Sequence, residues 1–260
     1  MRRAEREALA LGLLLGPAEL VPVSSSGHAT AIPWLLGWEV AGWEGERRKE
    51  LEVALHAGTA AALVVMGRPV RPVRPALLAA AVLPPAVAGL TLERWIEGHL
   101  GTPATLAAGL TAGAVALVLA DRGPGQRDAR DAGVADGVRL GLAQAAALVP
   151  GVSRSGATLA AARTRGFGRV AASQLSWEIA LPVLLGATGL KAVRRAGACE
   201  NGGRAEGTGP LYVGAGAAFA STLAVARAIG IERRGPLWPW AAWRTALAGA
   251  ILAVRHNRRR

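Results

Sequence analysis

Long apolar runs separated by short polar segments make up most of this sequence. The clearest runs span roughly 17 to 20 residues, the length that an α-helix needs to cross the hydrocarbon core of a bilayer. They end in arginine-rich or glycine- and proline-rich segments. They are Leu51–Met66, Pro75–Leu92, Thr102–Ala120, Val170–Leu190, Gly209–Ile229 and Leu237–Val254. The pattern predicts an all-α, polytopic membrane protein with about six transmembrane helices.

Two shorter apolar stretches, Ala8–Val21 and Val138–Val149, each run directly into a polar motif. Non-helical backbone is tolerated at membrane depth only where protein or a water-filled cavity surrounds it. We therefore expect these stretches to form two re-entrant helical hairpins.

The two polar motifs resemble each other. Val23-Ser24-Ser25-Ser26-Gly27 and Val152-Ser153-Arg154-Ser155-Gly156 match at four of five positions. A re-entrant stretch, a motif and spanning helices follow in the same order in each half, and three spans between the motifs would invert one half relative to the other. The sequence thus predicts one membrane domain over residues 1–260, an inverted repeat with halves of about 1–120 and 134–260 that share a site near a pseudo-two-fold axis.

Composition and charge agree with a membrane protein. Hydrophobic residues make up 52% of the chain, and the mean hydropathy is +0.30. The net charge of +12 does not indicate a nucleic-acid partner, because the arginines lie between apolar runs and in the tail Arg255–Arg260. Anionic lipid head groups are sufficient to account for them. The polar stretch Asp121–Asp136 is predicted to be a solvated connection between the halves, and tryptophans at run ends, such as Trp34, Trp95 and Trp238, are typical of interfacial anchors.

Both motifs have the composition of an anion site. A helix that begins at the serines would present free backbone N–H groups, serine hydroxyls and a positive dipole end. Two such helix starts converging from opposite sides, together with the planar guanidinium of Arg154, suit a diphosphate. The plainer interpretation is that both motifs are only helix caps. Arg154 favours a functional interpretation, because charge inside an apolar context usually marks a functional site.

Two residues beside the first motif carry reactive side chains. His28 follows the motif directly, and a neutral imidazole next to bound phosphate can act as a general acid, a general base or a nucleophile. Glu19 is the only acid between Glu7 and Glu39 and lies among apolar residues, where a carboxylate needs a cation, a metal or a proton. A divalent metal that bridges Glu19 and the diphosphate is the interpretation we favour over a protonated or capping glutamate. For His28 the alternative is a structural role.

Three further polar residues are weaker candidates. Glu178 lies inside a predicted span and either faces the site or pairs with an arginine. For Gln144 and His56 we favour packing or interhelical hydrogen bonds.

At these residues the chain resembles the undecaprenyl-diphosphate phosphatase family of the bacitracin-resistance type, which consists of polytopic bacterial membrane enzymes. The combination of Pro-Val-Ser-Ser-x-Gly-His with Gly-x-Ser-Arg-Ser-Gly-Ala-Thr is far more specific than either half. The matching segments fall in order along most of the chain, at Gly16–His28, Leu51–Thr59, Pro150–Thr158 and Leu181–Thr188.

The resemblance implies hydrolysis of undecaprenyl (C55 polyprenyl) diphosphate to the monophosphate on the outer face of the bacterial plasma membrane. This reaction recycles the lipid carrier for peptidoglycan and other cell-wall glycans and is associated with bacitracin resistance. The implied cofactor is Mg²⁺ or Ca²⁺, and the implied partners are the polyprenyl diphosphate and membrane lipids, with a homodimer left open.

Carried over residue by residue, the resemblance implies that Glu19, Ser25, His28 and Arg154 are catalytic. Ser25 or water would attack, His28 and Glu19 would manage protons or metal, and Arg154 would stabilise charge in the transition state. The expected phosphate-binding residues are Ser24, Ser26, Gly27, Ser153, Ser155, Gly156 and Thr158.

One position departs from the family pattern. The first acid of the family's Glu-x-x-x-Glu motif lies one helical turn before Glu19, on the same face, and this chain has Leu15 there. The departure removes a metal ligand or a base. Glu178, where the family is expected to have an apolar residue, is therefore a candidate to replace the missing carboxylate and to serve as a metal ligand.

Two other functions stay open from the sequence. Inverted repeats with broken helices also occur in transporters, so a lipid-phosphate translocator is one alternative. The second is a relative that binds polyprenyl phosphate without hydrolysing it, which Leu15 would favour.

Overall fold

The computed structural model describes residues 1–66, 74–200, 207–226 and 235–258. The described chain is all-α, and its β-type pairing is limited to an isolated bridge between Arg127 and Phe167. The elements in order are α1 (Arg3–Leu20), α2 (Ser25–Leu36), η1 (Glu39–Gly42), α3 (Gly45–Val65), α4 (Pro75–Leu100), α5 (Pro103–Ala120), η2 (Ala129–Asp131), α6 (Val134–Ala146), α7 (Arg154–Thr164), α8 (Arg169–Glu200), α9 (Gly209–Ala226) and α10 (Trp238–Asn257).

The predicted apolar runs and re-entrant stretches lie on these helices. Three described helices are long and apolar enough to cross a membrane, over Pro75–Leu92, Pro103–Ala120 and Gly209–Ala226. The predicted run Gly209–Ile229 ends in residues 227–229, which lie outside the described residues. The helices α3, α8 and α10 continue beyond the predicted runs into charged residues, which lowers their mean hydropathy.

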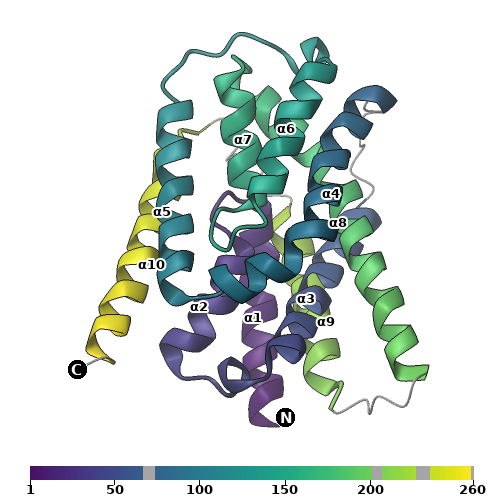
Figure 1. The fold of residues 1–260 in the computed structure, drawn as a ribbon, viewed down its shortest axis with the longest axis vertical. Helices are drawn as coiled ribbons and strands as arrows, with labels where there is room; N and C mark the ends of the chain where they lie inside the picture. Colours follow the sequence, from purple (N-terminus) through teal and green to yellow (C-terminus); the bar gives the residue numbers. More distant parts are fainter. Residues whose placement is uncertain (67–73, 201–206, 227–234, 259–260) are drawn as a thin grey trace.

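The helices that lead into the motifs enter from opposite ends of the molecule. In Figure 1, α1 rises from the end that carries both termini, and α6 descends from the other end. Each stops near the middle, where the loops that follow them come together. The loop after α1 begins where Val21, which precedes Pro22, takes an extended conformation that a helix cannot continue.

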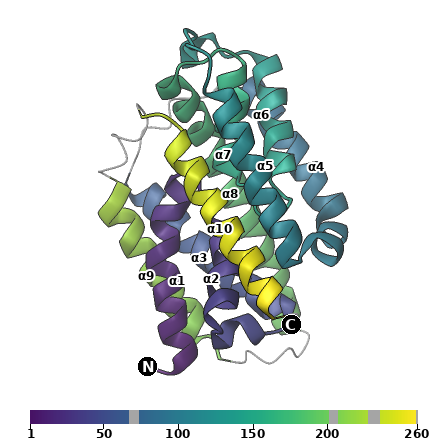
Figure 2. The same cartoon turned by 90° about the vertical axis from the view of Figure 1, so that its left-hand side faces the viewer.

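Helices from one half of the chain pack against helices from the other half. The helix α1 packs along α9, α6 packs along α4, and α5 and α10 lie side by side (Figure 2). Glycines allow this close approach. A Cβ on Gly12 would overlap the backbone carbonyl of Gly214 in α9, and one on Gly141 would lie 2.8 Å from the carbonyl oxygen of Ala80 in α4.

The connection between α5 and α6 is only partly solvated. Its middle is exposed, as at Asp128, but Asp136 is 3% exposed. The Asp136 carboxylate accepts hydrogen bonds of 2.8 Å from both Arg127 and Arg165. At the other end, Asp121 accepts a bidentate pair from Arg169. The prediction of a solvated connection over Asp121–Asp136 is therefore wrong at its ends, where Asp136 is held by Arg127 and Arg165 and Asp121 by Arg169 of α8.

Candidate active site

The two serine motifs form the same local structure. We call Val21–Ser24 the first loop and residues 147–153 the second loop. Ser24 caps α2 by accepting a hydrogen bond from the backbone N–H of Gly27 at 3.2 Å, and Ser153 caps α7 through Gly156 at the same distance. The predicted helix starts are thereby confirmed. Both caps have positive φ, 73° at Ser24 and 66° at Ser153, a backbone strain that non-glycine residues adopt mainly at functional sites.

The carboxylate of Glu19 is the point at which the two loops meet. It is 6% exposed. Its Oε1 lies 2.6 Å from Nη2 of Arg154, and its Oε2 accepts a hydrogen bond from the hydroxyl of Ser25. His56 of α3 places its Nδ1 3.2 Å from Oε2. Three of the predicted catalytic residues therefore share one contact cluster, which we call the Glu19 cluster, although Glu19 and Arg154 are 135 residues apart.

His28 occupies a different environment. It is 1% exposed, its Nδ1 donates to the backbone oxygen of Ser24 at 2.7 Å, and its Nε2 accepts a hydrogen bond from the indole N–H of Trp243 at 2.8 Å. These contacts engage both ring nitrogens and suit a neutral imidazole with its hydrogen on Nδ1. The structure thus places His28 behind the first loop, against α10.

The second loop contributes hydroxyls with different partners. Ser155 donates to the backbone oxygen of Val21 in the first loop at 3.2 Å, so the two loops are in direct contact. Thr158 is fully buried and bonds the hydroxyl of Ser176 in α8 at 2.6 Å. Ser26 is half-buried in the first turn of α2. The hydroxyls of Ser25, Ser26 and Ser155 are therefore nearer to solvent than that of Thr158, which holds α7 against α8.

The candidates for metal binding are not gathered in one place. In the described part of the chain, no group of three or more His, Cys, Asp and Glu side chains could hold a metal ion. Glu178 accepts a hydrogen bond of 2.7 Å from Gln174, and the Glu19 carboxylate already contacts two cationic or imidazole groups and a hydroxyl. These donors, as arranged, do not fit a divalent-ion site held by the protein alone. The replacement of the missing acid by Glu178 stays a prediction.

His56 also belongs to the Glu19 cluster, and its contact with Glu19 could not be predicted from the sequence. Its Nδ1 faces Glu19 and its Nε2 lies 3.8 Å from Glu52, so a chain of side chains runs from α3 to α1. Leu15, one turn before Glu19, is 2% exposed and packs in an apolar cluster with Leu51 and Leu55 of α3. Gln144 likewise makes the expected interhelical hydrogen bond, to the backbone oxygen of Ala81 at 2.9 Å.

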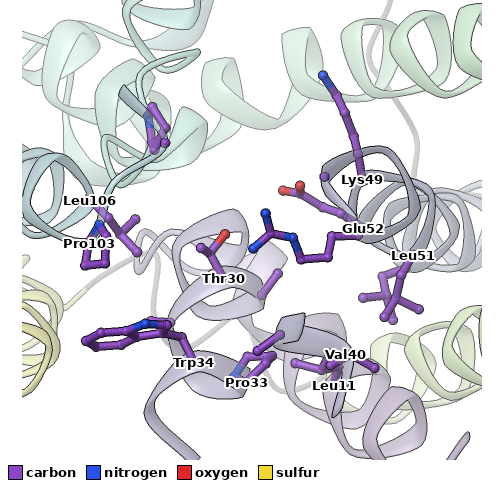
Figure 3. A pocket seen from close by; sticks show the side chains of 18 of the residues that line it. Leu11, Thr30, Pro33, Trp34, Val40, Lys49, Leu51, Glu52, Pro103 and Leu106 are labelled. Atoms are coloured by element: carbon purple, nitrogen blue, oxygen red, sulfur yellow. The ribbon is translucent and has the colours of Figure 1, made fainter. Parts of the chain in front are cut away.

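A cavity of about 410 Å³ lies near the cluster, between α2 and α3. Figure 3 shows Thr30, Pro33 and Trp34 of α2 on one side and Lys49, Leu51 and Glu52 of α3 on the other. Its lining is mainly apolar, with Arg48, Lys49 and Glu52 as the charged residues. Because Glu52 also lies against His56, the cavity reaches to within one side chain of the Glu19 cluster.

The sequence of this chain is similar to a protein family and to curated proteins. A family model described as "Bacitracin resistance protein BacA" matches residues 8–250. The curated undecaprenyl-diphosphatase of Geobacter sulfurreducens is 35% identical over 268 residues, which cover 95% of this chain and 96% of that protein. Those of Geobacter metallireducens, at 35%, and Novosphingobium aromaticivorans, at 32%, each cover 94% of this chain and 95% of their own length.

Proposed function

The chain belongs to the bacitracin resistance family BacA, and we propose that it hydrolyses undecaprenyl diphosphate at the Glu19 cluster. The observation that carries this proposal is the contact of one carboxylate with both Ser25 and Arg154. A nucleophile and its base within hydrogen-bond reach are typical of covalent or base-assisted hydrolysis. The relatives' activity and this geometry together favour neither the translocator nor the non-hydrolysing binding protein.

The resting ion pair suggests how the substrate is received. A diphosphate carries more negative charge than one carboxylate, and an arginine binds phosphate oxygens through a planar fork of donors. We expect Arg154 to exchange Glu19 for a phosphate oxygen when the diphosphate enters. The backbone N–H groups at the starts of α2 and α7 would bind the same group, as helix N-termini do.

Release of Arg154 leaves Glu19 beside Ser25 and His56. The carboxylate can then take a proton from the Ser25 hydroxyl or from a water molecule in its place, and that oxygen attacks the terminal phosphorus. The bond from this phosphorus to the bridging oxygen breaks, and the bridging oxygen leaves with the lipid monophosphate. If Ser25 is the attacking group, a water molecule then breaks the bond between the Ser25 oxygen and phosphorus and restores the hydroxyl; with either attacking group a water oxygen ends in the released phosphate. His28, fixed by Ser24 and Trp243, would hold the first loop rather than move a proton.

The two halves of this site are most simply explained as an inverted repeat. Supporting observations are the matching caps at Ser24 and Ser153, the entry of α1 and α6 from opposite ends, and the exchanged pairing of α1 with α9 and α6 with α4. We place the protein in the bacterial plasma membrane with about six spans and the site facing outward, as the family resemblance implies. The metal dependence and a homodimer also stay predictions, and no step above uses them.

Phosphate release from undecaprenyl diphosphate by the purified protein tests the proposal. We expect Glu19→Gln, Ser25→Ala and Arg154→Ala to lose roughly 100-fold or more in kcat/KM, the magnitude of a lost base or oxyanion donor. Ser173→Ala, in α8, is a matched control that should stay at the wild-type rate. A folded wild-type protein without activity, or a fully active Glu19→Gln variant, would disprove the proposal.

A further inference from the structure

A buried arginine outside both motifs contacts both loops. Arg244 of α10 is 0% exposed. Its guanidinium donates to backbone oxygens of the first loop, the second loop and α5. The acceptors are Pro22 at 3.4 Å, Gly151 at 2.9 Å, Val152 at 2.9 Å, Leu110 at 3.2 Å and Gly109 at 3.4 Å.

Two of these acceptors are equivalent positions of the repeated motif. Pro22 lies two residues before the cap Ser24, and Gly151 lies two residues before the cap Ser153. Arg244 bonds the first through Nη1 and the second through Nη2. One planar group thus joins the same backbone atom of each loop, between the two strained caps.

The arginine fits this place closely. A Cβ on Gly113 of α5 would overlap the guanidinium, and one on Gly156 would lie 2.6 Å from Nη1. In the described part of the chain, carbonyl oxygens are its hydrogen-bond partners and no carboxylate pairs with it. Burying a cation without a counter-charge is costly. Lysine, with three donors on one nitrogen, cannot reach the same set of acceptors.

We infer that Arg244 is a positioning residue that sets the spacing of the two loops across the Glu19 cluster. This inference rests on the proposed function. Arg244 acts through the carbonyls of Pro22 and Gly151, and these carry the caps from which Ser25 and Arg154 extend. Its neighbour Trp243 bonds His28 of α2, whose ring in turn bonds the Ser24 carbonyl, so two consecutive side chains of α10 act on the first loop. Displacements of about 1 Å in a catalytic group can lower rates by about 100-fold.

The test compares kcat and KM of Arg244→Lys with those of the wild type, per molecule of monodisperse protein. We expect kcat to fall roughly 10- to 100-fold even at saturating substrate. Arg163→Lys is the matched control, because Arg163 is 5% exposed and also bonds backbone carbonyls, those of Gly123 in the connection and Phe167 after α7; it should keep the wild-type kcat. Wild-type kcat and KM in Arg244→Lys would overturn the inference, whereas an inactive wild type would overturn the proposed function instead.

Hydrogen–deuterium exchange gives a readout that does not depend on activity. In Arg244→Lys, peptides that cover the first loop and the second loop should both exchange faster, and those of the connection should not. Unchanged exchange in either loop would contradict the inference. If the Arg244→Lys protein does not accumulate, Gly113→Ala provides the test. Its added methyl group would displace the guanidinium of Arg244. This variant should have a lower kcat and faster exchange in both loops. Gly249→Ala, at an open position of α10, should behave as the wild type, and equal kcat in the two alanine variants would refute the idea.

Discussion

The guanidinium of Arg154 lies 2.6 Å from the carboxylate of Glu19, and this contact joins the two serine loops through one buried ion pair. Each member of the pair offsets the charge of the other, which avoids the cost of a lone buried ion. It also means that a phosphate group entering the site competes with a carboxylate for Arg154. The resting site is therefore charge-neutralised by its own residues.

Restoring the acid one turn before Glu19 should strengthen metal dependence. Leu15→Glu would place a second carboxylate on the same helix face, and hard cations such as Mg²⁺ prefer carboxylate oxygens. We expect phosphate release by Leu15→Glu to reach half its maximum at a lower Mg²⁺ concentration than the wild type, and to vanish with a chelator. Leu15→Gln is the control without the charge. An unchanged Mg²⁺ requirement in Leu15→Glu would contradict this prediction.

His56 should support activity through Glu19. Its Nδ1 lies 3.2 Å from the carboxylate, so His56→Ala removes a partner from a buried group and allows the carboxylate to turn. We expect kcat/KM for phosphate release to fall about 10-fold, as for the loss of one charge-assisted hydrogen bond. His99→Ala, in the exposed end of α4, is the control. Equal rates in both variants would show that His56 only fills space.

The connection should make the protein sensitive to acid. Burial raises the pKa of Asp136, but hydrogen bonds from Arg127, the Gly133 backbone and Arg165 outweigh it, so its pKa lies well below the ordinary value. The unfolded chain then binds this proton at a higher pH than the folded protein does. The stabilisation is complete above the unfolded pKa of about 4 and is lost as the pH falls toward the folded value.

Thermal unfolding between pH 5 and pH 3 measures this effect. The wild type should lose stability over this range, and Asp136→Asn should start less stable and change less with pH. Asp128→Asn, in the exposed middle of the same connection, should follow the wild-type curve. If the stability of Asp136→Asn fell as steeply with pH as that of the wild type, the acid sensitivity would have to come from other residues.

The contact of α1 with α9 should tolerate no added methyl group at Gly12. A Cβ there overlaps the Gly214 carbonyl, and overpacking of this kind costs typically 1–3 kcal/mol. Gly216→Ala, at an open position of α9, should instead be neutral or stabilising, because alanine favours helix over glycine. Unfolding of the two variants in the same detergent gives the comparison, and equal stability would mean that the helices separate without cost.

The part of the site formed by the two serine motifs could be predicted from the sequence, because a helix break is indicated by residues next to one another in the chain. Glycine, serine and proline between apolar runs indicate a helix break, and the repeat of Val-Ser-x-Ser-Gly indicated that two such breaks belong together. The caps at Ser24 and Ser153 and the approach of the two loops follow from that pattern. The exact partners of Glu19 do not, because they depend on how α3 lies against α1.

The supporting residues of α10 were missed for a different reason. The pattern predicts that tryptophans at the ends of apolar runs are interfacial anchors, and this prediction does not reveal the role of Trp243, whose indole N–H is bonded to His28. Arg244 carried a usable signal, since it is a charge inside the last apolar run. Its partners are backbone carbonyls, however, and the residue types of the loops do not indicate which carbonyls would bind an arginine. Only the packing of α10 against α5 reveals the contact.

Because α10 is the last helix of the chain, the first loop can be completed only late in synthesis. The first loop is made early in synthesis, but the side chain that fixes His28 lies 215 residues later. A ribosome must therefore finish almost the whole polypeptide before the earliest part of the catalytic centre can take its final form. We expect chains that end before α10 to lack both this contact and the bonds of Arg244 to the loops, so that the first loop takes its final form only after the last helix has been inserted.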